Sequence, residues 1–114
     1  MGGTRAAGAR VERRVQLRYQ LRGYRILARN ARAGGYELDL IVRRGRRVIF
    51  CEVKAKTSDR FGDPFAMVGP EKQRRIRQAA ETWLAAHPEL DGLEPSFEVV
   101  AMRGGRLERL ANAF

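Results

Sequence analysis

YELDLIVRRGRRVIFCEVKAK, residues 36–56, decides the fold, because it predicts two β-strands joined by a short basic turn. We expect the first strand over Tyr36–Val42 and the second over Val48–Ala55. Large apolar residues recur at every second position of the first strand, and residues two apart share one face of a sheet. A β-hairpin is therefore predicted at the centre of the fold.

Four charged side chains are expected on one face of this hairpin: Glu37, Asp39, Glu52 and Lys54. A two-residue turn at Arg44-Gly45 would bring the strands into register. In that register Asp39 faces Phe50. Glu37 then faces Glu52, and facing residues project to the same side of a sheet. Three carboxylates and an ammonium on an otherwise apolar face are costly to bury without partners.

Two explanations of this charged face are open. Carboxylate oxygens suit a hard cation such as Mg²⁺, and such a cation suits the phosphodiester of a nucleic acid. The other explanation is a salt-bridged sheet face, because a Glu-x-Lys pair such as Glu52 and Lys54 is common in proteins. The spacing of Asp39, Glu52 and Lys54 across a single hairpin is the feature that favours a metal site.

Composition and length predict one domain over residues 1–114 that binds a polyanion. The chain has 114 residues, 44% of them hydrophobic, and a formal net charge of +10. Such a length suits a single small domain. The positive charge lies at the front, since residues 1–35 contain nine Arg and one Glu. Nucleic acid is the first candidate for the partner.

The sequence also predicts a cytoplasmic protein. Cys51 is the only cysteine, so no disulfide can form within the chain, and a reducing compartment fits. No apolar run approaches the ~18–20 residues of a membrane span. The N-terminus has no apolar stretch of the secretory type.

Outside the hairpin, the pattern predicts an α/β fold with a mixed β-sheet, in the order αβββαβ(β). Residues 1–6 are expected to be disordered. The helices and further strands are expected at about 5–22 (helix), 24–29 (strand), 70–86 (helix), 96–102 (strand) and 106–110 (edge strand), with a loop at 57–69.

Charged residues on the two predicted helices have both a functional and a structural interpretation. Glu12 lies on the core-facing side of the first helix, between Val15 and Tyr19 on a helical wheel, and either serves a site or pairs with a neighbouring Arg. The basic residues either contact phosphates or form a solvated surface: Arg10, Arg13, Arg14, Arg18, Lys56, Lys72, Arg74 and Arg75.

Several motifs resemble those of the YraN family, bacterial proteins of uncharacterised biology that are predicted endonucleases. They are Gly8-Ala-Arg-Val-Glu12, Arg22-Gly-Tyr-Arg-Ile-Leu-Ala-Arg-Asn30, Glu37-Leu-Asp-Leu-Ile41 and Phe50-Cys-Glu-Val-Lys54. Phe61-Gly62-Asp63-Pro64 and Lys72 continue a likeness that covers nearly the whole chain. Val11, Tyr36 and Lys56 depart from the family pattern of Gly, Gly and Arg, and the bulk of Tyr36 bears on how a substrate fits.

The family resembles Holliday-junction resolvases and the wider PD-(D/E)xK nucleases, which implies a restriction-endonuclease-like sandwich. The likeness implies Asp39, Glu52 and Lys54 as catalytic residues, with Glu12 as a helix-borne acid. Mg²⁺ or Mn²⁺ would be held by Asp39, Glu52, Glu12 and the backbone carbonyl of Val53. Glu37 would support these ligands without binding the metal itself.

Three functions are therefore weighed. The first is a structure-selective DNA endonuclease, which we expect to form a homodimer because a junction requires two symmetric cuts. The second is a non-catalytic nucleic-acid-binding protein, including one that binds RNA, that has kept the nuclease fold. The third, a structural adaptor, explains the charge but not the converging carboxylates.

Overall fold

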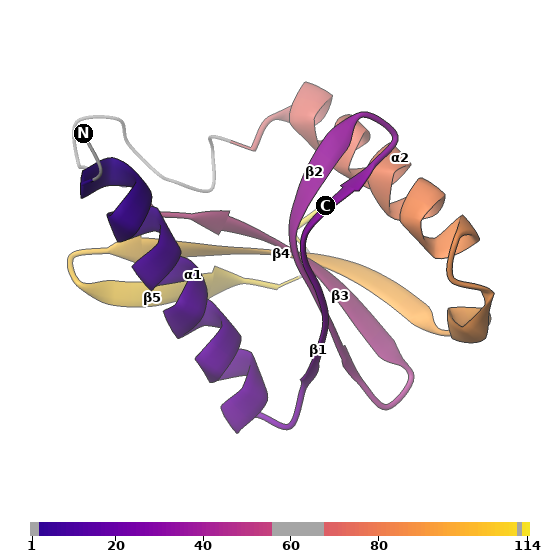
Figure 1. Cartoon of the computed structure of the whole chain (residues 1–114), viewed down its shortest axis with the longest axis horizontal. Helices are drawn as coiled ribbons and strands as arrows, with labels where there is room; N and C mark the ends of the chain where they lie inside the picture. The colour runs from indigo at the N-terminus through magenta and orange to yellow at the C-terminus, as the bar shows by residue number, and fades with distance from the viewer. Residues whose placement is uncertain (1–2, 56–67, 112) are drawn as a thin grey trace.

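The protein forms a five-stranded mixed β-sheet with one long helix on each face (Figure 1). The computed structural model describes residues 3–55, 68–111 and 113–114. The elements in chain order are α1 (Gly3–Leu21), β1 (Arg25–Ala33), β2 (Tyr36–Arg44), β3 (Arg47–Lys54), α2 (Pro70–Ala85), the 3₁₀ helix η3 (Pro88–Leu90), β4 (Glu94–Arg103) and β5 (Arg106–Leu110).

The strands lie in the order β1-β2-β3-β4-β5, and only the β3–β4 pair is parallel. A parallel pair needs a crossover connection, which α2 supplies here. The predicted α/β fold with a mixed sheet is thus confirmed, as are its two helices. Within the described ranges, neither helix is long and apolar enough to cross a membrane.

The first helix is longer than expected at its start. It begins at Gly3, inside the segment 1–6 that the sequence predicted to be disordered, and ends at Leu21. Residues 3–6 therefore belong to the helix, and that part of the prediction is wrong. Pro70 opens α2 as expected, because a proline in the first helical turn removes no hydrogen bond.

The turn of the central hairpin differs from the prediction. It lies at residues 45–46, and the register pairs Ile41 with Phe50 and Arg44 with Arg47. The predicted pairing of Asp39 with Phe50 is therefore wrong by two residues. A shift of two would by itself leave every side chain on its predicted face, because the side-chain period of a strand is two.

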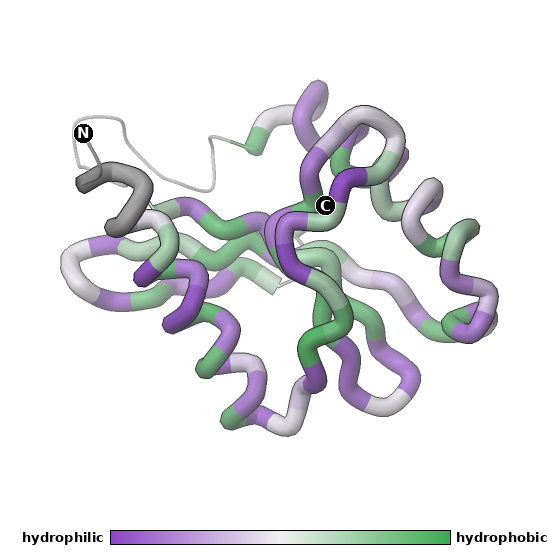
Figure 2. The backbone as a smooth tube through the Cα atoms, viewed as in Figure 1, coloured by the Kyte–Doolittle hydropathy of each residue, from purple (hydrophilic) through white to green (hydrophobic). Residues whose placement is uncertain are grey.

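Two hydrophobic clusters lie on opposite faces of the sheet. Val48 and Phe50 of β3 pack with Ile76 and Trp83 of α2. Their neighbours Ile49 and Cys51 pack in the cluster of α1, with Val11, Val15 and Tyr19. Figure 2 shows hydrophobic and hydrophilic residues alternating along both helices, each of which presents one apolar side to the sheet.

The strand β2 turns from one cluster to the other at Asp39. Leu40 packs in the α1 cluster, whereas Leu38 packs in the α2 cluster, although residues two apart normally share a face. Opposite this point, Asn30 of β1 has a positive φ of 50°. A non-glycine residue with positive φ is uncommon, and here it accompanies the twist. Asp39 consequently lies where the strand is accessible to residues of both helices.

Beyond the twist, the β1–β2 turn reaches α2 (Figure 1). Gly34 has a φ of +57°, and a Cβ at this position would lie 3.2 Å from Oγ1 of Thr82 on α2. Both the backbone conformation and the close approach therefore favour glycine. The end of the hairpin thus lies close to α2, and Tyr36 packs in the α2 cluster.

A buried polar contact attaches α1 to the sheet. The hydroxyl of Tyr19 donates a hydrogen bond of 2.6 Å to Oε1 of Glu98 on β4, whose side chain is only 1% exposed. Nη1 of Arg109 on β5 lies 3.5 Å from the same oxygen. A buried carboxylate is tolerated only where such partners satisfy it.

We predict that Tyr19→Phe lowers the free energy of unfolding by about 1–3 kcal/mol, because the buried Glu98 carboxylate loses a donor. Tyr24→Phe is the matched control, since the Tyr24 hydroxyl forms no hydrogen bond within the described part of the chain although Tyr24 packs in the same cluster as Tyr19. Urea unfolding of both variants measures the difference. Equal losses in the two variants would show that the Tyr19–Glu98 contact is not stabilising.

Candidate active site

Asp39 is held against β3 by a backbone amide. Its Oδ2 accepts a hydrogen bond of 2.9 Å from the N–H of Val53. The backbone pairing of β2 with β3 ends at Leu40 and Cys51, so the Asp39 carboxylate binds an amide just beyond the last pair. The N–H and C=O of one strand residue point to the same side. The carbonyl of Val53 therefore faces the side of β3 on which Asp39 lies.

Glu52 is the buried centre of a group of charges. Its side chain is 8% exposed, and its Oε1 lies 3.2 Å from Nζ of Lys72 and 3.9 Å from Nζ of Lys54. Lys54 follows two residues later on the same strand, whereas Lys72 comes from the first turn of α2. Two elements thus supply the cations that face this carboxylate.

Asp39 and Glu52 lie close enough to disturb each other. Burial raises the pKa of Asp39 to about 7, and the charge of Glu52 and a hydrogen bond with its carboxyl act in the same direction. The Val53 amide and Lys72 oppose this rise in pKa. Near neutral pH, the pair therefore gains from a proton or another positive charge between its members.

Lys54 and Tyr36 border this acidic pair. Burial lowers the pKa of Lys54, and the neighbouring Lys72 lowers it further. Burial also raises the pKa of the Tyr36 hydroxyl, and the negative charge of Glu52 raises it further. The positive charge of Lys72 lowers this pKa. Tyr36, which departs from the family pattern, thus lies beside the site.

Glu12 approaches the site from α1. Burial raises its pKa first, and then the charges of Asp39 and Glu37 do so. Glu12 can act on Asp39 because β2 turns between the two helices at that residue. Among the described residues, however, no three His, Cys, Asp or Glu side chains are close enough together to hold a metal ion. Glu12 and the exposed Glu37 therefore lie outside the immediate Asp39–Glu52 pair.

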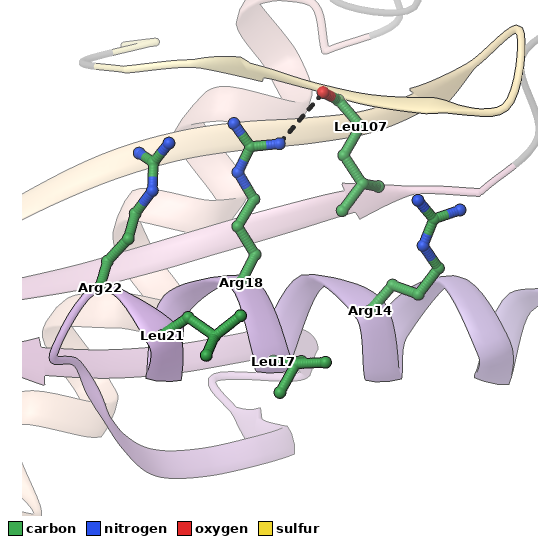
Figure 3. A pocket seen from close by; sticks show the side chains of 6 residues that line it. All are labelled: Arg14, Leu17, Arg18, Leu21, Arg22 and Leu107. Atoms are coloured by element: carbon green, nitrogen blue, oxygen red, sulfur yellow. Dashed lines mark hydrogen bonds between the residues drawn. The ribbon is translucent and has the colours of Figure 1, made fainter.

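The basic residues of α1 are spread over its surface, and Arg14 and Arg18 lie on one side together with Arg22, which follows the helix. Arg10, Arg13 and Arg14 are exposed, while Arg18 donates a hydrogen bond of 3.2 Å to the carbonyl oxygen of Leu107 on β5. Figure 3 shows the side chains of Arg14, Arg18 and Arg22 extending from α1 and its C-terminal end toward β5. They line a groove with a volume of about 330 Å³. This row of guanidinium groups suits the phosphates of a nucleic acid.

The basic residues of α2 are engaged within the protein. Arg74 lies 2.9 Å and Arg75 3.4 Å from the carboxylate of Glu71, and all three side chains are mostly exposed. Lys72 faces Glu52 instead of solvent. Lys56, which the sequence also assigned to nucleic-acid binding, lies outside the described residues.

The sequence did not predict the place of Lys72 beside Glu52, since the two roles expected for this lysine were a phosphate contact and a solvated surface. One local signal was present. A helix N-terminus carries a partial positive charge and disfavours cations. A lysine in the first turn after Pro70 therefore indicates a nearby acidic partner. The 3.2 Å contact shows that this partner is Glu52.

The pKa of Asp39 predicts a fall in stability as the pH rises. Its folded value of about 7 lies above the ordinary value of 3.8, so between these values the folded protein binds the extra proton. The stabilisation that this proton supplies is complete below about pH 4 and is lost as the pH passes 7. We expect metal-free wild-type protein to lose on the order of 1–2 kcal/mol between pH 5.5 and 8.5 relative to Asp39→Asn.

Urea unfolding in EDTA at several pH values measures this difference. Asp91→Asn, which changes an exposed acid near η3, serves as the control and is expected to follow the wild type. Parallel pH profiles of wild type and Asp39→Asn would show that Asp39 does not titrate in this range.

The comparisons with known proteins agree on one family. Residues 11–102 match the uncharacterised protein family UPF0102. The chain is 42% identical over 93 residues to a UPF0102 protein of Klebsiella pneumoniae, which covers 81% of this chain and 73% of that protein. A Ralstonia nicotianae UPF0102 protein is 40% identical over 118 residues (98% and 88%), and the Escherichia coli UPF0102 protein YraN is 39% identical over 94 residues (82% and 72%). The chain therefore belongs to the UPF0102 family, to which YraN also belongs.

Proposed function

We propose that this protein is a metal-dependent endonuclease that hydrolyses phosphodiester bonds in branched or junction DNA. The observation that carries the proposal is the pair of carboxylates that neighbouring strands hold together, Asp39 and Glu52. Two ionised carboxylates repel each other, so holding them side by side costs free energy. A divalent cation between them would remove that cost.

The donors present fit Mg²⁺ or Mn²⁺. Asp39 and Glu52 supply carboxylate oxygens, and the carbonyl of Val53 faces the same side of β3. Glu12 is close enough to influence Asp39 and would join through a water molecule. When bound, the metal ion would polarise the phosphoryl group and lower the pKa of a water molecule.

The remaining residues of the site would position the reactants. The ammonium of Lys54 lies beside Glu52 and would orient the attacking water and offset the charge that develops on the phosphate. Tyr36 borders the same carboxylate and would limit how the substrate strand enters. Neither role requires a base to be recognised.

The arginines of α1 would bind the DNA backbone. Contacts to phosphates provide affinity and orientation but little sequence information. The preference for branched DNA rests on the resemblance of the family to Holliday-junction resolvases. Because one chain has one Asp39–Glu52 pair, symmetric cleavage of a junction would need two copies.

A second function, nucleic-acid binding without catalysis, is favoured by a different observation. Lys54 and Lys72 already give Glu52 two cationic partners, and the described residues hold no ready-made group of three metal-binding side chains. A salt-bridged sheet face would have these features. The two functions differ in whether the acidic pair is required for cleavage or only for stability.

We predict that purified wild-type protein cleaves DNA in Mg²⁺ or Mn²⁺, and that Asp39→Asn or Glu52→Gln lowers the rate by about 100-fold or more. Binding should persist or strengthen, since each change removes negative charge and leaves the arginines of α1 in place. Junction, flap, duplex and single-stranded DNA are compared by gel assay, with binding measured by fluorescence anisotropy.

Glu94→Gln is the matched control for the loss of an acid, because Glu94 forms only a 4.0 Å pair with Arg46 on the exposed surface. It should cleave as the wild type does. Cleavage that survives in both Asp39→Asn and Glu52→Gln would refute the proposed site. Tight DNA binding by a wild type that cleaves none of the four substrates would support the non-catalytic function.

We also predict a salt dependence of DNA binding that depends on α1. Replacing Arg10, Arg13 and Arg14 by Gln should flatten the log–log slope on duplex DNA by about 0.9 per lost phosphate contact. The double variant of Arg74 and Arg75 is the comparison, and it should change the slope less because both pair with Glu71. A larger effect of the α2 variant would place the DNA along α2 instead.

A further inference from the structure

One carboxylate oxygen of Glu52 faces two ammonium groups. Oε1 lies 3.2 Å from Nζ of Lys72 and 3.9 Å from Nζ of Lys54. The place of Lys54 follows from β3 itself, because residues two apart in a strand share a face. Lys72 belongs to another element and makes the shorter contact.

The position of Lys72 within α2 indicates a dedicated role. Its ammonium lies in the first turn of the helix, where the partial positive charge of the helix end repels it. Glu52 supplies the opposite charge that holds it there. Arg74 and Arg75, the next basic residues of α2, pair with Glu71 on the surface and do not share this contact.

A divalent cation and Lys72 would compete for the negative charge of the same carboxylate. A metal ion shared by Asp39 and Glu52 needs a free lone pair on Glu52, and its charge repels both ammonium groups. The side chain of Lys72 is 31% exposed and that of Lys54 is 16% exposed. Lys72 therefore has the more open path away from the carboxylate.

We propose that Lys72 is a tethered cation: it occupies the metal-binding side of Glu52 when no metal is bound, and a divalent cation displaces it. Lys72 thereby positions Glu52 in the metal-free protein and weakens metal binding. This inference rests on the proposed function, because it takes the Asp39–Glu52 pair to be the metal site.

The test measures Mn²⁺ affinity by isothermal titration calorimetry without DNA. Lys72→Met removes the competing charge and should tighten Mn²⁺ binding by about tenfold or more, as expected for a charge-assisted contact. Arg77→Met is the matched control, because it removes one charge from the exposed side of the same helix. Its Mn²⁺ affinity should stay within about twofold of the wild type. Lys72→Arg keeps the cation and should also stay near the wild type.

Thermal unfolding gives a second measurement. In EDTA, Lys72→Met should unfold at a lower temperature than wild type, since the buried Glu52 has lost its nearest cation. Mn²⁺ should raise the unfolding temperature of Lys72→Met more than that of the wild type. Lys72→Gln, which keeps a donor for Glu52, takes the place of Lys72→Met if the latter has no cooperative transition.

The outcomes separate this inference from the proposed function. If wild-type protein binds Mn²⁺ and loses that binding in Asp39→Asn, the metal site stands. Unchanged or weaker Mn²⁺ binding by Lys72→Met would then overturn the role of Lys72 alone. Absence of Asp39-dependent Mn²⁺ binding in both wild type and Lys72→Met would overturn the metal site, and the tethered cation with it.

Discussion

Repulsion between two carboxylates, Asp39 and Glu52, is the constraint on which the centre of this protein depends. Burial and the negative charge of Glu52 raise the pKa of Asp39 to about 7, so the fully ionised form of the pair is unfavourable near neutral pH. The Val53 amide satisfies one acid, and two lysines satisfy the other. Each of these partners stabilises one of the two carboxylates. None of them removes the repulsion between the two negative charges.

The fold brings this pair together through the twist of β2. If the strand ran without interruption, Leu38 and Leu40 would pack on one face, but they lie in different clusters. Asn30 with its positive φ and the contact of Gly34 with α2 accompany the change. Asp39 at the turning point is consequently within electrostatic reach of Glu12 on α1 and of Lys72 on α2.

The sequence predicted the elements and the faces well, for a physical reason. The period of two in the central hairpin is unaffected by a register shift of two, so Asp39 and Glu52 lie close together although the turn lies at residues 45–46 and not at 44–45. The predicted convergence of Glu37 with Glu52 is wrong, because Tyr36 and Leu38 on either side of Glu37 pack in the α2 cluster. Register itself depends on the conformation of the turn, which Arg44-Gly45-Arg46 leaves ambiguous. The start of α1 was misplaced because the Gly-rich first residues have low helix propensity.

The surroundings of the pair could not be predicted in the same way. The contact between Lys72 and Glu52 joins residues separated by the segment 56–67, and no local period relates their positions. The twist at Asp39 is accompanied by the positive φ of Asn30 on the opposite strand and by the close approach of Gly34 to α2. Such long-range contacts belong to the folded sheet and have no counterpart in the hydrophobic pattern.

A second buried acid in the same sheet helps to separate structural charge from functional charge. Glu98 accepts a 2.6 Å hydrogen bond from Tyr19, a core residue of α1, and pairs with Arg109, so it joins three elements. Glu52 lies beside a second acid, Asp39, and faces two lysines. If Glu52 served stability alone, one hydrogen-bond donor and one cation, as at Glu98, would be enough to stabilise its carboxylate. The paired acids with their two lysine partners are therefore the feature on which our proposal of a cation site rests.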